Sequence, residues 1–75
     1  MATAIKRPYN VFRVVRTLSE WEEPKEHRTF AGSTWATSPK KAAQNVRFRK
    51  GAKYAKEVID GVGYTEIIEY LAEAQ

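Results

Sequence analysis

Ser38-Pro39 and Gly51 enclose the best-defined element of this 75-residue chain. A serine hydroxyl accepts a hydrogen bond from a free N–H of the first helical turn, and a proline at the next position has no N–H to leave unpaired. Glycine readily takes the left-handed conformation that ends many helices. The sequence therefore predicts a helix from Pro39 to about Lys50, with Gly51 just beyond its end.

The inner face of this helix is narrow. At 3.6 residues per turn, Ala42, Ala43 and Val46 form one apolar stripe, and Phe48 falls on the other side of the helix. Small side chains let a helix lie close to a sheet. Because the chain contains no cysteine, the helix and its packing partner must hold together without a disulfide.

Two strands are predicted before the helix. Tyr9–Leu18 is rich in β-branched and aromatic residues and alternates, and Arg28–Thr37 has a similar character. The polar, proline-containing segment Ser19–His27 is typical of a connection. Consecutive strands with a short link most simply pair antiparallel, so we expect a β-hairpin.

Within the second strand, Gly32 indicates a β-bulge or a close backbone approach. Simple alternation places Phe30 on the same face as Gly32. Trp35, just before the helix cap, is expected to pack under the helix.

The C-terminal third fits two structures. Ala52–Ile59 has the composition of a second short helix, and Asp60–Gly63 is a turn. The apolar residues that follow have the i, i+3, i+4, i+7 spacing of a helix, which we predict over residues 64–74. These apolar residues are Tyr64, Ile67, Ile68 and Leu71. A strand over the same residues is the alternative, because a two-stranded hairpin alone is marginally stable.

The predicted fold class is therefore α+β: an antiparallel β-hairpin packed by a central basic helix, with a C-terminal helix. The alternative is a third strand and a β-β-α-β order. Hydrophobic residues make up 43% of the chain, which is enough for one core. We expect a single small domain over residues 1–75, with residues 1–7 flexible.

Several function classes are disfavoured by the sequence. A single histidine, His27, cannot build a metal site alone, and Gly61-Val62-Gly63 matches only half of a dinucleotide-binding fingerprint. No secretory signal and no apolar run of membrane-spanning length are present, which favours the cytoplasm over a membrane. We expect no enzymatic activity, no cofactor, no metal and no small-molecule substrate.

Charge is divided along the chain. The formal net charge is +4, and residues 40–56 hold seven basic residues and no acid, whereas residues 57–75 hold five acids and no base. Such a basic segment suits a polyanion, because lysine and arginine neutralise phosphates and release counterions. We therefore predict a nucleic-acid-binding protein, for DNA or RNA, with Arg13 and Arg16 adding to the patch from the first strand. The candidate binding residues are Lys40, Lys41, Arg47, Phe48, Arg49, Lys50 and Lys53.

The alternative function is a protein-interaction or accessory module, with a homodimer among its forms. Trp21 lies in a polar, acidic loop where a partner can reach it, and tryptophan is enriched at interface hot spots. This module would use an edge strand and exposed aromatic residues, and the charge polarity would dock one protomer on another. The simpler interpretation of the basic helix is a solvated face, or one that pairs with Glu66, Glu69 and Glu73. The question posed by the sequence is whether Arg47, Arg49 and Lys50 face solvent or those acids.

Overall fold

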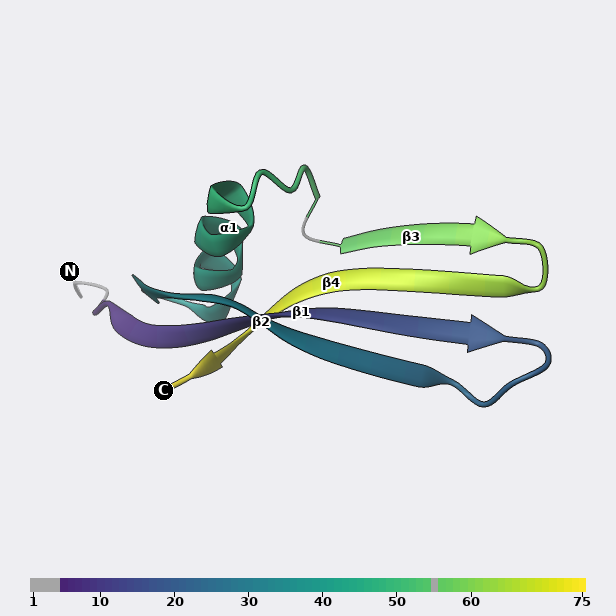
Figure 1. Ribbon diagram of the computed structural model, residues 1–75. Helices are drawn as coiled ribbons and strands as arrows, with labels where there is room; N and C mark the ends of the chain where they lie inside the picture. The colour runs from purple at the N-terminus through teal and green to yellow at the C-terminus, as the bar shows by residue number, and fades with distance from the viewer. Residues whose placement is uncertain (1–4, 55) are drawn as a thin grey trace.

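The computed structural model describes residues 5–54 and 56–75 as one four-stranded antiparallel sheet and one α-helix. The elements in chain order are β1 (Arg7–Ser19), β2 (Lys25–Ala36), α1 (Pro39–Arg49), β3 (Lys56–Gly61) and β4 (Tyr64–Ala74). The strand order β2-β1-β4-β3 joins two hairpins through their long strands β1 and β4 (Figure 1). Residues 1–7 were predicted to be flexible, and positions 1–4 of that segment lie outside the described residues. Arg7 is the first residue of β1.

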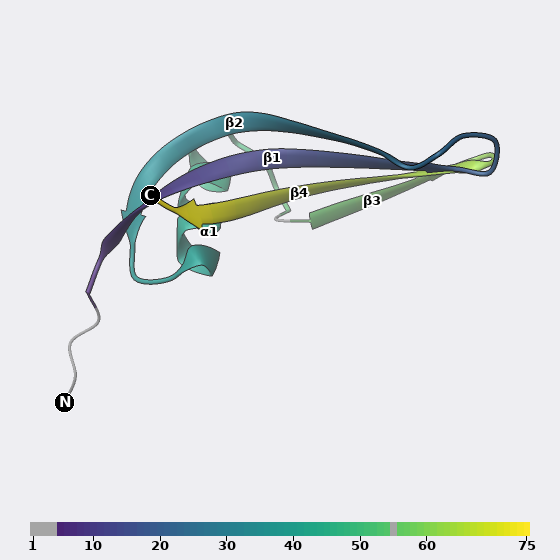
Figure 2. The ribbon, with the colours of Figure 1, turned by 90° about the horizontal axis from the view of Figure 1, so that it is seen from below.

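Helix α1 covers one face of the sheet at one end only. The hairpins extend beyond it, and the chain measures 52 × 23 × 22 Å (Figure 1). Seen from below, the strands lie in front of the helix (Figure 2). We call the side of the sheet that carries Tyr9 and Val11 the helix face, because these residues pack with α1. The opposite side, which carries Phe12 and Val14, is the open face, since successive residues of a strand point to opposite sides.

The core is small and lies between α1 and the helix face. Tyr9 and Val11 of β1 pack with Ala42 and Val46 of α1, and Ala36 at the end of β2 completes the cluster. The predicted inner stripe of the helix is confirmed, because its three residues are all buried. Burial of so few side chains makes each of them count toward stability.

Both predicted helix ends are confirmed. The Ser38 hydroxyl accepts a hydrogen bond from the N–H of Lys41 at 3.2 Å, and Pro39 begins the helix. At the other end Gly51 has φ +74°, and its N–H donates to the carbonyl of Phe48 at 3.0 Å. The next N–H, that of Ala52, donates to the carbonyl oxygen of Arg47 at 3.1 Å, which completes a Schellman cap.

The predicted irregularity at Gly32 is confirmed as a β-bulge. Val11 pairs with Gly32, yet the next residue, Phe12, pairs with Phe30, so that Ala31 is the extra residue. Gly32 has φ +152°, and a Cβ built there would lie 3.5 Å from the Cγ1 of Val46. The bulge reverses the expected side of Phe30, which lies opposite Phe12 on the open face, because one inserted residue shifts the alternation.

The predicted C-terminal helix is wrong, and so is the second short helix. Residues 64–74 form β4, as the alternative held, and Lys56–Gly61 forms β3, so the sheet has four strands instead of three. β4 lies between β1 and β3 and carries apolar residues on both of its faces. Ile68 therefore lies on the helix face, and Ile67 lies on the open face. A central strand of this kind loses the alternation that distinguishes strands from helices.

We expect Val46→Ala to lower the free energy of unfolding by about 2 kcal/mol, because it removes two buried methyl groups and leaves a cavity. Val46 is 1% exposed and faces both Val11 and the bulge. Val62→Ala is the matched control, since Val62 is 94% exposed in the β3–β4 turn. Urea denaturation of the two variants checks the expectation, which fails if both lose the same stability.

Candidate nucleic-acid interface

The outward side of α1 carries Phe48 between exposed polar and basic residues. Phe48 is 74% exposed, which confirms that it lies off the core stripe. Lys40 and Lys41 of the first turn are exposed, as is Lys50 at the C-cap. A solvent-exposed ring with lysines on the same helix presents both a flat apolar surface and positive charge.

Arg47 is bound to the backbone that follows its own helix. Its Nη1 donates to the carbonyl oxygens of Ala52 and Lys53, at 2.9 and 2.8 Å. The Nε atom is buried and has no hydrogen-bond partner among the described residues. The guanidinium also lies 5.3 Å from the centre of the Phe48 ring. Arg47 thus closes the turn after α1 and supports Phe48 from one side.

Arg49 is also occupied by backbone. Its Nη2 donates to the carbonyl oxygen of Ser33 in β2 at 2.8 Å, which ties the end of the helix to the sheet. Among the described residues, neither arginine forms an ion pair with the acidic C-terminal segment. In the described part of the chain, the ion pairs are Arg16–Glu26, Lys25–Glu22 and Arg28–Glu73. Arg47 and Arg49 therefore bind backbone carbonyls and face neither solvent alone nor the acids of β4. Lys50 and the lysines of the first turn remain exposed.

A basic and aromatic niche lies beside the helix, between the segment after α1 and the helix face. It encloses about 350 Å³ and is lined by Arg13, Lys53, Tyr54, Glu57 and Tyr70, with Ala52 and Ile68. The Lys53 ammonium lies 5.6 Å from the centre of the Tyr54 ring. Because Arg13 lines this niche, its side chain lies on the same side of the sheet as α1.

Arg16 does not share that side. It alternates to the open face of β1, where its Nε lies 3.3 Å from Glu26 of β2. The expectation that Arg16 extends the basic patch is therefore wrong, because Arg13 and Arg16 are an odd number of residues apart on one strand. Tyr54 and Tyr70 were not singled out from the sequence. Tyr54 follows Lys53 directly, whereas Tyr70 fell inside a predicted helix.

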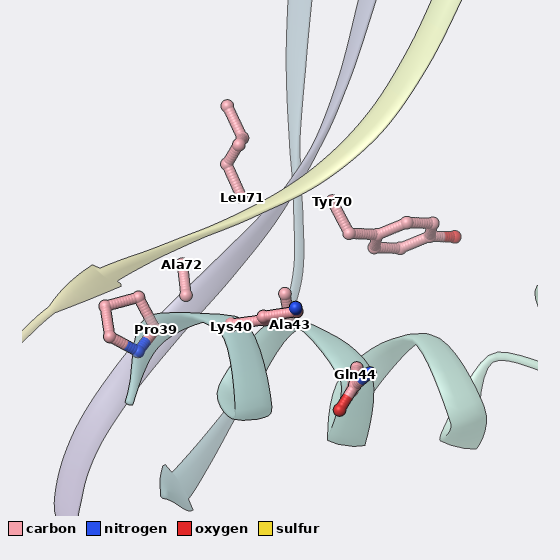
Figure 3. A pocket seen from close by; sticks show the side chains of 7 residues that line it. All are labelled: Pro39, Lys40, Ala43, Gln44, Tyr70, Leu71 and Ala72. Atoms are coloured by element: carbon pink, nitrogen blue, oxygen red, sulfur yellow. The ribbon is translucent and has the colours of Figure 1, made fainter. Parts of the chain in front are cut away.

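A second, shallower groove separates α1 from β4. It encloses about 230 Å³ and is mostly apolar. Figure 3 shows Ala72 and Tyr70 on the helix side of β4 and Leu71 pointing the other way. Lys40 and Gln44 lie along the helix edge of this groove. The groove thus continues the polar outer side of α1 toward Tyr70, which also lines the niche.

Trp21 lies in an exposed connection between β1 and β2, as expected, whereas Trp35 does not lie where the sequence placed it. Trp21 is 73% exposed, but its ring lies against Gly63, where a Cβ would come within van der Waals overlap of the indole. The N–H of Glu20 donates to the carbonyl of Gly63 at 3.1 Å, so the tips of the two hairpins touch. Trp35 is exposed and pairs with Pro8 at the sheet end, so the expectation that it packs under the helix is wrong.

Comparison of the chain with protein-family models, with curated proteins and with solved structures finds no match. Over residues 5–54 and 56–75, α1 is too short and too polar to cross a membrane. The same residues contain no group of three or more histidine or acidic side chains placed to hold a metal ion.

We expect Arg47→Ala to lower the free energy of unfolding by about 1.5 kcal/mol, because two charge-assisted hydrogen bonds are lost and two carbonyls lose their donor. Lys50→Ala removes an exposed charge three residues along and should change stability by less than about 0.5 kcal/mol. Chemical denaturation of both variants checks this difference. Equal stability of the two would show that Arg47 does not support the turn.

Proposed function

We propose that this protein is a small, non-enzymatic, cytoplasmic nucleic-acid-binding protein that uses the outer side of α1 and the adjoining niche. Backbone phosphates are contacted by Lys40, Lys41, Lys50 and Lys53, with Arg13 in the niche. Phe48 offers its ring to an unpaired base. Arg47 and Arg49, which were candidates for the same role, are positioning residues that hold this surface in place.

The observation that carries the proposal is the placement of Lys40 and Lys41 in the first turn of α1. The positive end of the helix dipole disfavours cations there, and the first turn contains no acid to offset them. Neither lysine takes part in an ion pair among the described residues. These two charges thus do not stabilise the helix, whereas basic residues in the last turn interact favourably with the helix dipole. A polyanionic ligand supplies a reason.

The rest of the surface is chemically consistent with this ligand. Lysines act as point charges toward phosphate, and their binding is driven by counterion release. An exposed aromatic ring beside them stacks on any base and adds affinity without sequence readout. Glu57 lines the niche as well, so we expect the strongest phosphate contacts along α1.

The double variant Lys40→Gln/Lys41→Gln should bind short single-stranded DNA and RNA more weakly than the wild type. Its slope of log K against log salt should be smaller in magnitude by about 1.4, which is about 0.7 for each lost phosphate contact on a single strand. Its stability should be unchanged or slightly higher, because the unfavourable interaction with the helix dipole is removed. Fluorescence-anisotropy titrations at several salt concentrations, with thermal denaturation, check both expectations.

The control is Lys25→Gln/Lys56→Gln, which removes the same charge from β2 and β3, away from α1. Both variants have the same net charge, so a long-range effect of charge alone would weaken them equally. Equal salt slopes for the two variants would contradict the proposed surface, as would absence of wild-type binding at low salt.

Phe48→Ala should lower affinity for single strands about tenfold, because base–aromatic stacking contributes about 1–3 kcal/mol per base. Affinity for duplex DNA should change much less, since paired bases offer no free face. Phe30→Ala is the matched control, because Phe30 is also a solvent-accessible phenylalanine but lies on the open face. The assignment of Phe48 fails if both variants bind single strands alike.

A further inference from the structure

The open face of the sheet is apolar along its centre. Phe12 of β1 lies edge to face against Phe30 of β2, with ring centres 5.8 Å apart, and Leu71 of β4 is opposite Phe12 on the other side. Val14 is buried on this face and lies in register between Arg28 and Glu69. Other apolar residues on the open face are Leu18, Trp35, Val58 and Ile67.

No helix of the described residues packs on this face, although the Arg28 guanidinium lies 4.5 Å from the centre of the Phe12 ring and Val14 is buried by its neighbours. α1 contacts the other side of the sheet, and at the end that α1 covers, the strands lie in front of the helix in Figure 2. Phe30 is 56% exposed, and Val58 is exposed to a similar degree. A sheet is stabilised by a packed layer on each apolar face, so this face has the composition of a surface that a second layer covers.

The charges of the open face are balanced. By register it carries three bases, Arg16, Arg28 and Lys56, and four acids, Glu26, Asp60, Glu69 and Glu73. Arg28 Nη2 lies 2.6 Å from Glu73 Oε1, and Arg16 pairs with Glu26. Lys56 is directly opposite Glu69. The face thus has almost no net charge, although the chain carries +4.

This balance restricts what can cover the face. A polyanion finds no uncompensated base there, and a partner of one predominant sign would leave half of these charges unmatched. A surface that is apolar at its centre and mixed in sign around it is complementary to another surface of the same kind. The open face of a second copy is such a surface, and an isologous contact of this type is the commonest route to a homodimer.

The available area is sufficient. The four strands are 13, 12, 6 and 11 residues long, and at about 3.4 Å per residue and a spacing of about 4.8 Å they give a face of roughly 700 Å². Two such faces in contact would bury on the order of 1,400 Å² in total, within the range of stable specific interfaces. We propose that two copies of this chain pack through their open faces, as a two-layer β-sandwich with a helix on each outer side.

The dimer leaves α1 and the niche free, because they lie on the other side of each sheet. It therefore brings two nucleic-acid-binding surfaces to opposite sides of one particle. The inference does not depend on the proposed function, since it follows from the open face alone.

Sedimentation equilibrium of the wild-type chain, from micromolar to submillimolar concentration, should give a mass that approaches twice that of one chain. Because the contact is mainly apolar, the dissociation constant should change little between low and high salt. Phe30→Ala should weaken the dimer by at least about tenfold, as truncation of a central aromatic residue does. A wild-type chain that stays monomeric over the whole range overturns the proposal.

A second measurement locates the contact without altering an apolar residue. Because the chain is free of cysteine, a single introduced cysteine can be labelled selectively. Ser33→Cys places a bulky maleimide on the open face, and Gln44→Cys places it on the outer side of α1; both positions are exposed. The label at residue 33 should abolish the dimer, and the label at residue 44 should leave it intact.

These outcomes separate the two proposals. A dimer that survives the label at residue 33, or that is lost only with the label at residue 44, places the interface elsewhere and overturns the inference. Loss of nucleic-acid binding in Lys40→Gln/Lys41→Gln with the dimer retained supports both proposals. A dimer that does not bind nucleic acid contradicts only the proposed function.

Discussion

The contact of Val46 with the sheet determines how the remaining parts are placed. Val46 lies against Val11 and above Gly32, whose positive φ belongs to the β-bulge between β1 and β2. The same bulge sends Phe30 to the other side of the sheet. Two surfaces result. The packed helix leaves its outer side and exposed lysines in solvent, and the bulge places Phe30 beside Phe12 on the open face.

The two surfaces differ in how their charges are used. On the open face, arginines are neutralised by glutamates of other strands, as in the pair of Arg28 on β2 and Glu73 on β4, which spans β1. On the helix side, Arg47 and Arg49 donate to backbone carbonyls and thereby fix the end of α1, while the lysines keep their charge exposed. Exposed lysines are the flexible point charges that phosphate binding uses, and arginines with planar donors are better suited to fixed structural contacts. The net positive charge of the chain is thus concentrated on one side.

Local signals in the sequence predicted the local structure well. Ser38, Pro39 and Gly51 fixed the helix because caps act within one turn, and the stripe of Ala42 and Val46 followed from periodicity. The strand at β4 was only the alternative, because a strand with apolar residues on both faces has no alternation to detect. The positions of Phe30 and Arg16 depend on sheet register, and the roles of Arg47 and Arg49 depend on carbonyls that only the folded chain brings near. Lys40, Lys41 and Phe48 were identified from the sequence as candidate binding residues, whereas the niche with Tyr70 required the tertiary structure.

The central claim is that nucleic acid binds on the helix side alone, and backbone amide chemical shifts test it most directly. Titration of isotopically labelled protein with a short single-stranded oligonucleotide at low salt should move the resonances of residues 40–54 and of Arg13. The resonances of Phe12, Phe30 and Leu71 on the open face should stay in place at constant protein concentration. Shifts centred on the open face, or no shifts at all, would contradict the account.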